Sequence, residues 1–381
     1  MKSKVAIVTP GAFAIPSERN SSVEQAVGHI CEQLKDRWQF YVFSKKTGEL
    51  PAREQRDGIV HYRPNGASYL TQASARLRQI RPNLIQVENR PNMAMLLKKK
   101  HPRTPVWLSV HSTHFVSAPQ IQGPRLKQCL KAADRIIVNS RFMLEYLKGI
   151  VPGIEYKTAV NYPGFDPDRF YPRWTEPGRE SREALLHELG YRDKKIILYA
   201  GRLIEIKGVH HVLEVLPDII RDNPNAVFVV IGSARYGKDV LTPYVKHLHQ
   251  LGNRMPNHVR FIPFVPHNEM GKWFRAADVV VVPSAEQEAF GLVNVEAMAC
   301  GVPVVATRAG GIPEIIRHRE TGFLLDPERL HPELVQAVNR LLKDEGLARR
   351  MGELAADHAV KHFTWKHSAE RYAQLLGAMG V

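Results

Sequence analysis

Two glutamates, Glu288 and Glu296, have the spacing expected of a pair that binds one ligand. They are separated by seven residues, AFGLVNV, whose pattern predicts a helix of about three turns that begins at Phe290. Glu288 would then lie just before the helix and Glu296 about two turns inside it. Because carboxylate oxygens accept hydrogen bonds, two of them placed this way could hold the hydroxyl groups of a polyol.

The start of the same predicted helix could hold an anion. Its first turn would present the backbone N–H groups of Phe290, Gly291 and Leu292 at the positive end of the helix dipole, where phosphate binds well. Glu296 lies among apolar residues and needs partners, since burying a polar group without them costs a few kcal/mol. Two interpretations stay open: a glutamate on the one wet edge of the helix, or a pair of carboxylates that hold a polyol beside N–H groups that hold phosphate.

Strand-like runs separated by helical or polar stretches must position these residues. The glutamates lie between predicted strands 278–283 and 302–307, which together form a parallel β-α-β unit. The same alternation, typical of doubly wound parallel sheets, recurs along the chain, with predicted strands at 4–9, 40–43, 59–62, 84–87, 106–110, 135–138, 195–200, 226–231 and 259–263.

Length and composition indicate two domains. A chain of 381 residues with 44% hydrophobic content can bury two cores of ordinary size, and the Pro- and Gly-rich run 161–172 is the predicted linker. We find no apolar run of about 18 residues and no signal-peptide pattern, so we expect a soluble or peripheral, cytoplasmic protein. Cys31, Cys129 and Cys300 have no paired spacing, which fits buried thiols in a reducing compartment.

The positive charge is concentrated in the first half. Residues 1–165 carry 25 Lys and Arg against 11 Asp and Glu, whereas residues 166–381 carry 28 against 27. Such asymmetry suggests an anionic partner, either an acidic polymer, a phospholipid surface or nucleic acid, although a merely well-solvated basic domain is the simpler alternative. Two clusters that we expect to be exposed contribute much of it: Arg76, Arg78 and Arg81, then Lys98, Lys99, Lys100, His101 and Arg103.

Three further residues follow predicted strands, and ligands of open α/β sheets bind beyond the carboxyl ends of strands. His111 follows the strand 106–110, where it is either a ligand contact or a structural histidine. Arg202 and Lys207 flank the turn after the strand 195–200, where two cations could grip a diphosphate. Exposed loop charges are the alternative for this pair.

No residue spacing predicts a metal site. Asp166 and Asp168 resemble an Asp-x-Asp metal signature, but Pro167 between them indicates a turn and no predicted strand leads in. His247 and His249 would face different sides of a helix. His358 and His362 share a helix face but have no third ligand in view.

Four motifs in their order along the chain resemble family 4 of the retaining GT-B glycosyltransferases. They are Gly201-Arg202 with Lys207-Gly208, Glu288 with Glu296, the run Gly310-Gly311-Ile312-Pro313-Glu314, and Phe363-Thr364-Trp365 at the last helix. The runs LPDII, YVKHLHQLG and YPRW are similar to the branch of spore coat protein SA and related bacterial enzymes. The resemblance covers essentially the whole chain.

This resemblance implies an α/β GT-B fold, with two Rossmann-like, doubly wound parallel-sheet domains facing a cleft. Residues 1–165 would form the acceptor domain and residues 166–363 the nucleotide-sugar domain. Residues 364–381 would form a helix that crosses back to the first domain.

The resemblance also implies a role for individual residues. Arg202 and Lys207 would hold the donor diphosphate, and Glu296 the ribose hydroxyls. Glu288 would contact hydroxyls of the transferred sugar, and so would His111 from the first domain. The other donor contacts would come from the amides of Phe290, Gly291 and Leu292 on the phosphate side and from Gly232, Phe264 and Val265 around the base.

The implied reaction is metal-independent and cofactor-free transfer of a hexose from a nucleotide-sugar, with a UDP-sugar favoured. Breaking the glycosyl phosphate bond builds positive charge on the anomeric carbon and negative charge on the diphosphate, which two cations and a helix N-terminus stabilise. In this family retention is thought to proceed by front-face attack, without a protein nucleophile.

The basic first half adds an expectation about partners. We expect an anionic glycan, polymer or lipid-linked acceptor and no nucleic acid. We also expect peripheral contact with the inner membrane face or the spore coat.

One loop departs from the family pattern. The family usually has a Gly-Gly pair in its first loop, and the aligned residues here are Asn20 and Ser21. Their side chains could narrow the site or add hydrogen-bond donors. Two alternatives to the transferase therefore stay open: a non-catalytic spore-coat or scaffold protein on the same fold, and a GT-B nucleotide-sugar epimerase.

Overall fold

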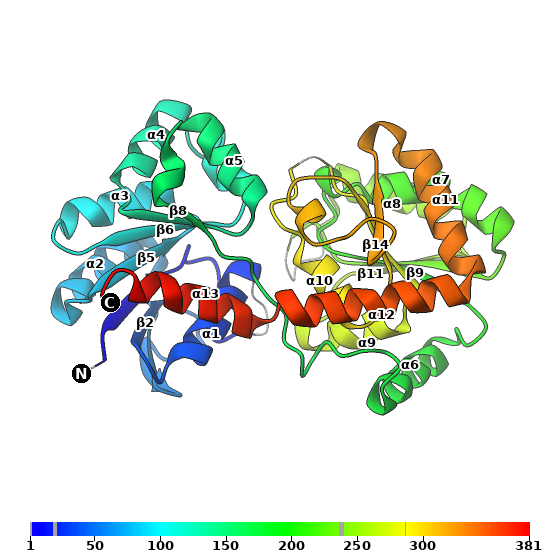
Figure 1. Cartoon of the computed structure of the whole chain (residues 1–381), viewed down its shortest axis with the longest axis horizontal. Coiled ribbons are helices and arrows are strands. Elements are labelled where there is room, and N and C mark those ends of the chain that lie inside the picture. Colours follow the sequence, from blue (N-terminus) through cyan, green and yellow to red (C-terminus); the bar gives the residue numbers. More distant parts are fainter. Residues whose placement is uncertain (1, 18–20, 236–239, 286) are drawn as a thin grey trace. The chain divides into compact units, whose positions relative to one another are not determined.

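A computed structural model describes residues 2–17, 21–235, 240–285 and 287–381, which divide into two compact units (Figure 1). Unit 1 contains the residues up to Gly164 together with Trp365–Val381, and unit 2 contains Phe165–Thr364. Each unit is an α/β layer structure around its own sheet. Asn20 lies outside the described residues, so its predicted role is untested.

The described part of unit 1 holds an eight-stranded sheet in the order β3-β4-β2-β1-β5-β6-β7-β8. Its strands pair in parallel except β3, which is antiparallel to β4. The strands are β1 (Lys4–Val8), β2 (Gln39–Phe43), β3 (Arg53–Arg56), β4 (Ile59–Tyr62), β5 (Leu84–Glu88), β6 (Val106–Val110), β7 (Arg135–Val138) and β8 (Thr158–Val160).

Helices connect these strands, and the last helix of the chain completes the unit. The helix α13 packs against α1 and places Tyr372 and Leu376 in the same core as Phe40 and Trp107. The helices are α1 (Ser22–Leu34), α2 (Tyr69–Ile80), α3 (Pro91–Lys100), α4 (Gly123–Ala132), α5 (Arg141–Ile150) and α13 (Trp365–Gly377).

In unit 2 the described residues form a six-stranded sheet in the order β11-β10-β9-β12-β13-β14, with all pairs parallel. Its strands are β9 (Lys195–Ala200), β10 (Ala226–Ile231), β11 (Val259–Ile262), β12 (Val279–Val282), β13 (Val304–Thr307) and β14 (Gly322–Leu325). Its helices are α6 (Glu176–Leu189), α7 (Val209–Asp222), α8 (Pro243–Gly252), α9 (Met270–Ala276), α10 (Leu292–Ala299), α11 (Leu330–Lys343) and α12 (Glu345–His362).

The strands form where apolar residues run without interruption, because helices cover both faces of a parallel sheet. In β12 all four valines are buried, and burying one valine side chain contributes about 1.5–3 kcal/mol. The strands predicted from such runs are present, whereas β3, β8 and β14 were not predicted. The sequence of β3, REQR, is charged because most of this edge strand faces solvent.

The helix that carries Glu296 begins later than predicted. It starts at Leu292, and Gly291 before it has a left-handed backbone with φ of 90°. Because a helix cannot continue through that conformation, the amides of Phe290 and Gly291 precede the helix instead of forming its first turn. Glu296 is therefore about one turn inside the helix, not two.

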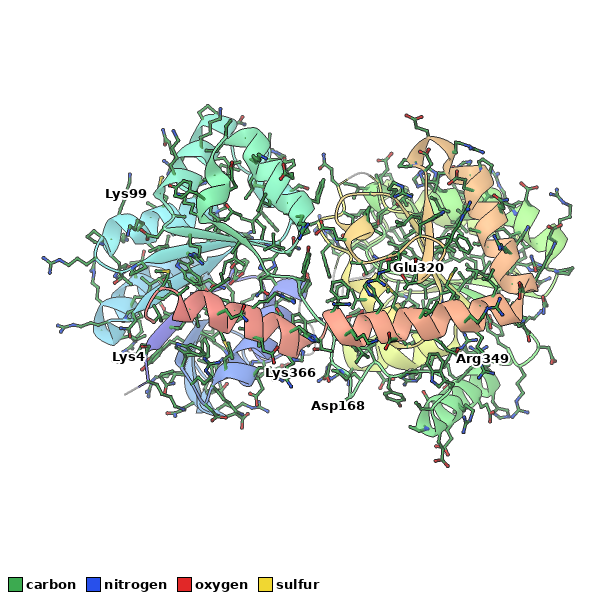
Figure 2. The ribbon with its side chains drawn as sticks, in the orientation of Figure 1. Lys4, Lys99, Asp168, Glu320, Arg349 and Lys366 are labelled. Carbon is green, nitrogen blue, oxygen red and sulfur yellow. The ribbon has the colours of Figure 1, made fainter. Side chains whose placement is uncertain are left out.

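Several surface predictions can also be compared with the structure. The three cysteines are buried, and burial raises the pKa of each thiol. Of the basic clusters, Lys99 lies on the outer surface of α3 (Figure 2), but His101 is buried, so its predicted exposure is wrong. In the described part of the chain, no helix combines the length and apolar character needed to cross a bilayer.

Candidate functional site

The residues predicted to bind a ligand in unit 2 gather at one edge of its sheet. All strands of this sheet are parallel, so the loops that follow them share the carboxyl edge, where ligands of such folds bind. These loops carry Arg202 after β9, Gly232 after β10, Phe264 and Val265 after β11, Glu288 after β12, and Gly310 and Gly311 after β13.

Lys207 and Glu288 form an ion pair at this edge, and both side chains are partly buried. Two loops are joined to make it: the N–H of Ala285 donates to the carbonyl of Ile206 over 2.8 Å. The hydroxyl of Ser284 also donates to Glu288 Oε2, over 3.2 Å. The pair is thus built into the fold, and Arg202 is exposed on the loop that leads to it.

The loop after β13 fixes the backbone of Glu288. The N–H of Gly311 donates to the Glu288 carbonyl over 2.8 Å. Gly310 has a left-handed backbone with φ of 54°, and a Cβ there would lie 1.9 Å from the same carbonyl oxygen. Only glycine fits this position, so the Gly-Gly pair holds the backbone of Glu288 in place.

Glu296 is buried to 4% exposure, and its partner is a histidine that the sequence analysis did not single out. His267, in a short 3-10 turn (His267–Glu269), places Nε2 at 2.7 Å from Glu296 Oε1. Burial opposes a charged imidazole, but the Glu296 carboxylate outweighs that effect and raises the pKa of His267. The interpretation that placed the Glu296 carboxylate on a wet edge of the helix is therefore wrong.

The start of α10 is held by its own residues. Both the backbone and the side-chain nitrogen of Asn294 donate to the carbonyl of Gly291, each over 2.9 Å. Phe290 is buried and packs edge-on against Phe363 at 5.9 Å between ring centroids. Leu292 is the first residue of the helix. Of the three amides predicted to face phosphate, those of Phe290 and Gly291 therefore lie in the turn before the helix and only that of Leu292 lies in it.

In unit 1 a chain of hydrogen bonds holds His111 beyond the end of β6. His111 Nε2 lies 2.7 Å from Glu88 Oε2, and because a carboxylate only accepts, that nitrogen carries a proton. Gln86 Nε2 donates to Glu88 Oε1 over 2.5 Å, and Tyr372 in α13 donates to Gln86 over 2.7 Å. A pocket of unit 1 is lined by polar members of this chain and neighbours: Gln86, Glu88, Ser109, His111, Asn161, Ser368 and Tyr372.

Ser21, the described residue of the pair that departs from Gly-Gly, has a structural role. It is the N-cap of α1, with an extended backbone (φ −96°) that needs no glycine, and its hydroxyl accepts from the N–H of Val23. The same hydroxyl is hydrogen bonded to Glu24. Glu24 is buried, its Oε1 has no hydrogen-bond partner among the described residues, and burial raises its pKa.

Comparison with known proteins places this arrangement in a family. A model described as Glycosyl transferases group 1 matches residues 182–358, and one described as Glycosyltransferase Family 4 matches residues 23–169. Spore coat protein SA of Bacillus subtilis (strain 168) is 32% identical over 96% of this chain and 97% of its own. The chain belongs to glycosyltransferase family 4.

Two further comparisons agree with this assignment. Putative glycosyltransferase YtcC of B. subtilis (strain 168) is 30% identical to this glycosyltransferase over 97% of the chain and 90% of the relative. The crystal structure of Anabaena Alr3699/HepE in complex with UDP-glucose matches with a TM-score of 0.78 and 24% identity, covering 98% of this chain and 99% of that one. The predicted GT-B fold with two Rossmann-like domains is thereby confirmed.

In this glycosyltransferase, three polar residues that were not predicted lie beside the predicted site residues. They are His267, Glu88 and Glu24. A signal existed for each: Glu88 and His267 follow predicted strands, and Glu24 stands three residues after a serine, as in a helix capping box. Of the two aspartates in the linker, Asp166 accepts the N–H of Asp168 over 3.1 Å, which is the turn geometry expected there.

Proposed function

We propose that this glycosyltransferase moves a hexose from a nucleotide-sugar to an anionic or surface-associated acceptor. A UDP-sugar is the favoured donor. The transfer keeps the anomeric configuration of the sugar and uses no metal ion. The observation that carries the proposal is the Lys207–Glu288 ion pair, held by two loops at the carboxyl edge of the unit 2 sheet. The UDP-glucose bound to Alr3699/HepE supports the donor class.

The pair supplies what the reaction needs. When a glycosyl phosphate bond breaks, the diphosphate departs with negative charge. Lys207, with Arg202 on the same loop, offers cations for that charge, and positioned charges of this kind are usually the largest single catalytic contribution. Glu288 offers carboxylate oxygens to hydroxyls of the sugar, which helps to fix the anomeric carbon for attack.

Glu296 and His267 form the second part of the proposed donor site. Carboxylates commonly bind the two hydroxyls of a ribose because each oxygen accepts one hydrogen bond. Glu296 is already ordered by His267 Nε2 at 2.7 Å, so little conformational freedom is lost when a donor binds. In unit 1 we assign His111, which Glu88 orients, to contact with sugar hydroxyls.

A turnover assay tests this proposal. Release of UDP from UDP-glucose, with the glucose passing to a hydroxyl group of an anionic polysaccharide acceptor, is measured in EDTA for the wild type, for Lys207→Gln and for Lys343→Gln. Removing Lys207 should lower kcat by about 10²–10³, as for loss of one stabilising donor. Lys343 is the matched control, because it forms an exposed ion pair with Asp222 elsewhere in unit 2, and its variant should turn over like the wild type.

The anomeric configuration of the product completes the test. Retention predicts that the anomeric configuration of the donor is kept in the glycoside product, as read by NMR. Turnover that stops in EDTA would contradict metal independence, and an inverted product would contradict retention. If only the sugar of the donor changes and no glycoside forms, the protein is an epimerase, and if no donor reacts or binds, the scaffold alternative stands.

A further inference from the structure

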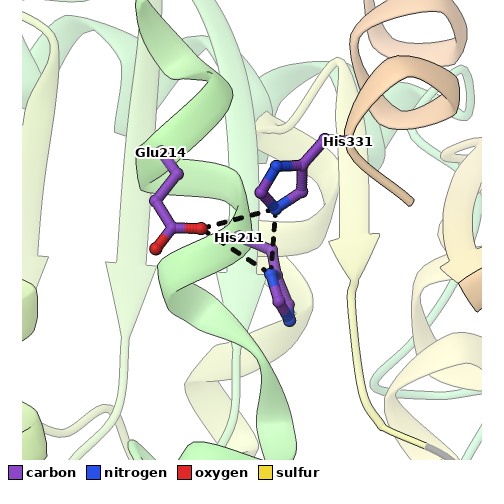
Figure 3. Close-up of side chains that lie close together, drawn as sticks. All are labelled: His211, Glu214 and His331. Atoms are coloured by element: carbon purple, nitrogen blue, oxygen red, sulfur yellow. Dashed lines mark hydrogen bonds and ion pairs between the residues drawn. The ribbon is translucent and has the colours of Figure 1, made fainter. Parts of the chain in front are cut away.

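Three side chains on one surface of unit 2 are arranged like the ligands of a metal ion. His211 and Glu214 come from α7 and His331 from the start of α11 (Figure 3). His211 Nδ1 lies 3.0 Å from His331 Nε2, and Glu214 Oε2 lies 3.8 Å from the first nitrogen and 3.4 Å from the second. One atom from each residue therefore faces a common point.

These separations fit tetrahedral coordination. In a zinc site with bonds of about 2.0–2.2 Å, neighbouring ligand atoms lie about 3.3–3.6 Å apart. Of the three distances here, 3.4 Å lies in that range, and 3.0 and 3.8 Å lie within about 0.3 Å of it. We propose that His211, Glu214 and His331 bind a Zn²⁺ ion that links α7 to α11, with water in the fourth position.

The ligand types favour zinc over magnesium and calcium. Two imidazole nitrogens and one carboxylate oxygen suit late first-row divalent ions, whereas Mg²⁺ and Ca²⁺ prefer shells made of oxygen. No metal site is predicted here from the sequence, because His211 and His331 are 120 residues apart. Only the packing of α7 on α11 brings them together.

The fold holds the three residues in place before an ion arrives. His211 and Glu214 are three residues apart on one helix and so share a face. The apolar sides of the two helices lie in one core, which includes Val212 and Leu216 of α7 and Leu334 and Val338 of α11. Such preorganisation lowers the entropy cost of coordination.

The ion would stabilise the structure around a functional turn without entering the transfer step. Lys207 and Gly208 come directly before α7, and the N–H of His211 donates to the Gly208 carbonyl over 3.0 Å. A Cβ on Gly208 would lie 1.9 Å from the carbonyl oxygen of Pro283, so this turn already fits tightly against the loop after β12. Zinc on His211 would anchor the first turn of α7, the helix that starts directly after Gly208.

A zinc titration tests the proposal without any donor or activity measurement, so it is independent of the proposed function. The chelator-treated protein is titrated with ZnCl₂ by calorimetry as wild type, Glu214→Gln and His331→Gln. Both positions are exposed, at 37% and 46% of the side chain, so both variants should fold. We expect one ion per chain and at least about tenfold weaker binding in each variant, the lower limit even for loss of a residue around the ligands.

Two controls make the result specific. The double variant His358→Gln/His362→Gln removes a histidine pair on α12, whose rings lie 4.8 Å apart, and should bind zinc like the wild type. Co²⁺ in place of Zn²⁺ should give the visible absorption of a four-coordinate ion in the wild type and not in His331→Gln. The proposal is overturned if the wild type binds zinc no more tightly than His331→Gln, or if only the α12 variant loses binding.

Discussion

Glu24 is a buried carboxylate in surroundings that disfavour its charge. Glu24 is 2% exposed, and its Oε1 has no hydrogen-bond partner among the described residues. Burial raises the pKa of the carboxyl group above its ordinary value of 4.5. Between the unfolded-state pKa and this higher folded-state pKa, the folded chain binds more protons than the unfolded chain. The stability contributed by Glu24 therefore falls as pH rises through that window.

We predict that Glu24→Gln stabilises the protein at neutral pH. The amide keeps an acceptor for Ser21 and removes the buried charge, and we expect a gain of about 0.5–2 kcal/mol in the free energy of unfolding. Urea unfolding at several pH values measures it, and the gain should shrink as the pH falls through the folded-state pKa of Glu24. A variant that is less stable at neutral pH, or a gain that grows on acidification, would count against this account.

His267 has the opposite dependence. Its folded-state pKa is raised by Glu296, so its ion pair contributes fully below the ordinary histidine pKa of about 6.5 and is lost as pH rises through the folded-state value. His267→Gln should therefore lower the free energy of unfolding more at pH 6 than at pH 8, because the ion pair is formed at the lower pH and lost at the higher one. His187→Gln, an exposed histidine in α6, should show no such difference, and an equal loss at both pH values would refute the assignment.

At the scale of elements, the position of Glu288 depends on a tight contact between two loops. A Cβ at Gly310 would lie 1.9 Å from the Glu288 carbonyl oxygen, on a backbone with φ of 54°. Gly310→Ala should lower the free energy of unfolding by about 1–3 kcal/mol, the usual cost of a strained backbone position, and weaken donor binding because Glu288 must move.

Gly149→Ala is the matched control for that variant. Gly149 lies in α5, where a Cβ would meet nothing within 4 Å, so alanine should stabilise the helix by about 1 kcal/mol. Urea unfolding and donor calorimetry of both variants decide the matter. Unchanged donor affinity in Gly310→Ala would show that the loop does not position Glu288.

The sequence predicted elements well where apolar runs are long and poorly where local packing decides. The buried strand β10 was predicted at its observed bounds, because it is a continuous apolar run next to turn residues. The start of α10 was misplaced, because Gly291 adopts a left-handed backbone that its neighbours do not reveal. His267 was missed as the partner of Glu296, because the pair joins a short turn to the helix α10 and the two residues are 29 positions apart in the chain.

At the scale of the whole molecule, the charge asymmetry suggests an anionic surface as the site of action. Residues 1–165 carry 25 basic against 11 acidic residues, and Lys99, Lys100 and Arg103 are exposed at the end of α3. Lys98 is a poorer probe, because it pairs with Asp134 over 2.9 Å.

We predict that neutralising these three exposed charges weakens binding to anionic vesicles. The triple variant Lys99→Gln/Lys100→Gln/Arg103→Gln should lose about 1 kcal/mol of binding free energy per charge, and wild-type binding should weaken with added salt. Sedimentation with phosphatidylserine vesicles measures both effects.

The control removes three exposed charges from unit 2 instead, as Lys246→Gln/Arg254→Gln/Arg350→Gln. It should bind vesicles like the wild type. If both triple variants lose the same affinity, the effect is one of net charge and not of the α3 surface. If neither loses affinity, the basic half is a solvated surface and the membrane part of the proposal fails.

Donor binding tests the central claim most directly. Calorimetry and thermal shift with UDP-, GDP-, ADP- and dTDP-sugars in EDTA are compared for the wild type, Glu296→Gln and Glu320→Gln, an exposed glutamate of unit 2 (Figure 2). We predict that one donor class binds the wild type, adds about 2.7 kcal/mol of stability at a hundred times its dissociation constant, binds Glu320→Gln equally and loses affinity for Glu296→Gln. Absence of binding by every donor, or equal binding by Glu296→Gln, would contradict a nucleotide-sugar site at this edge of the sheet.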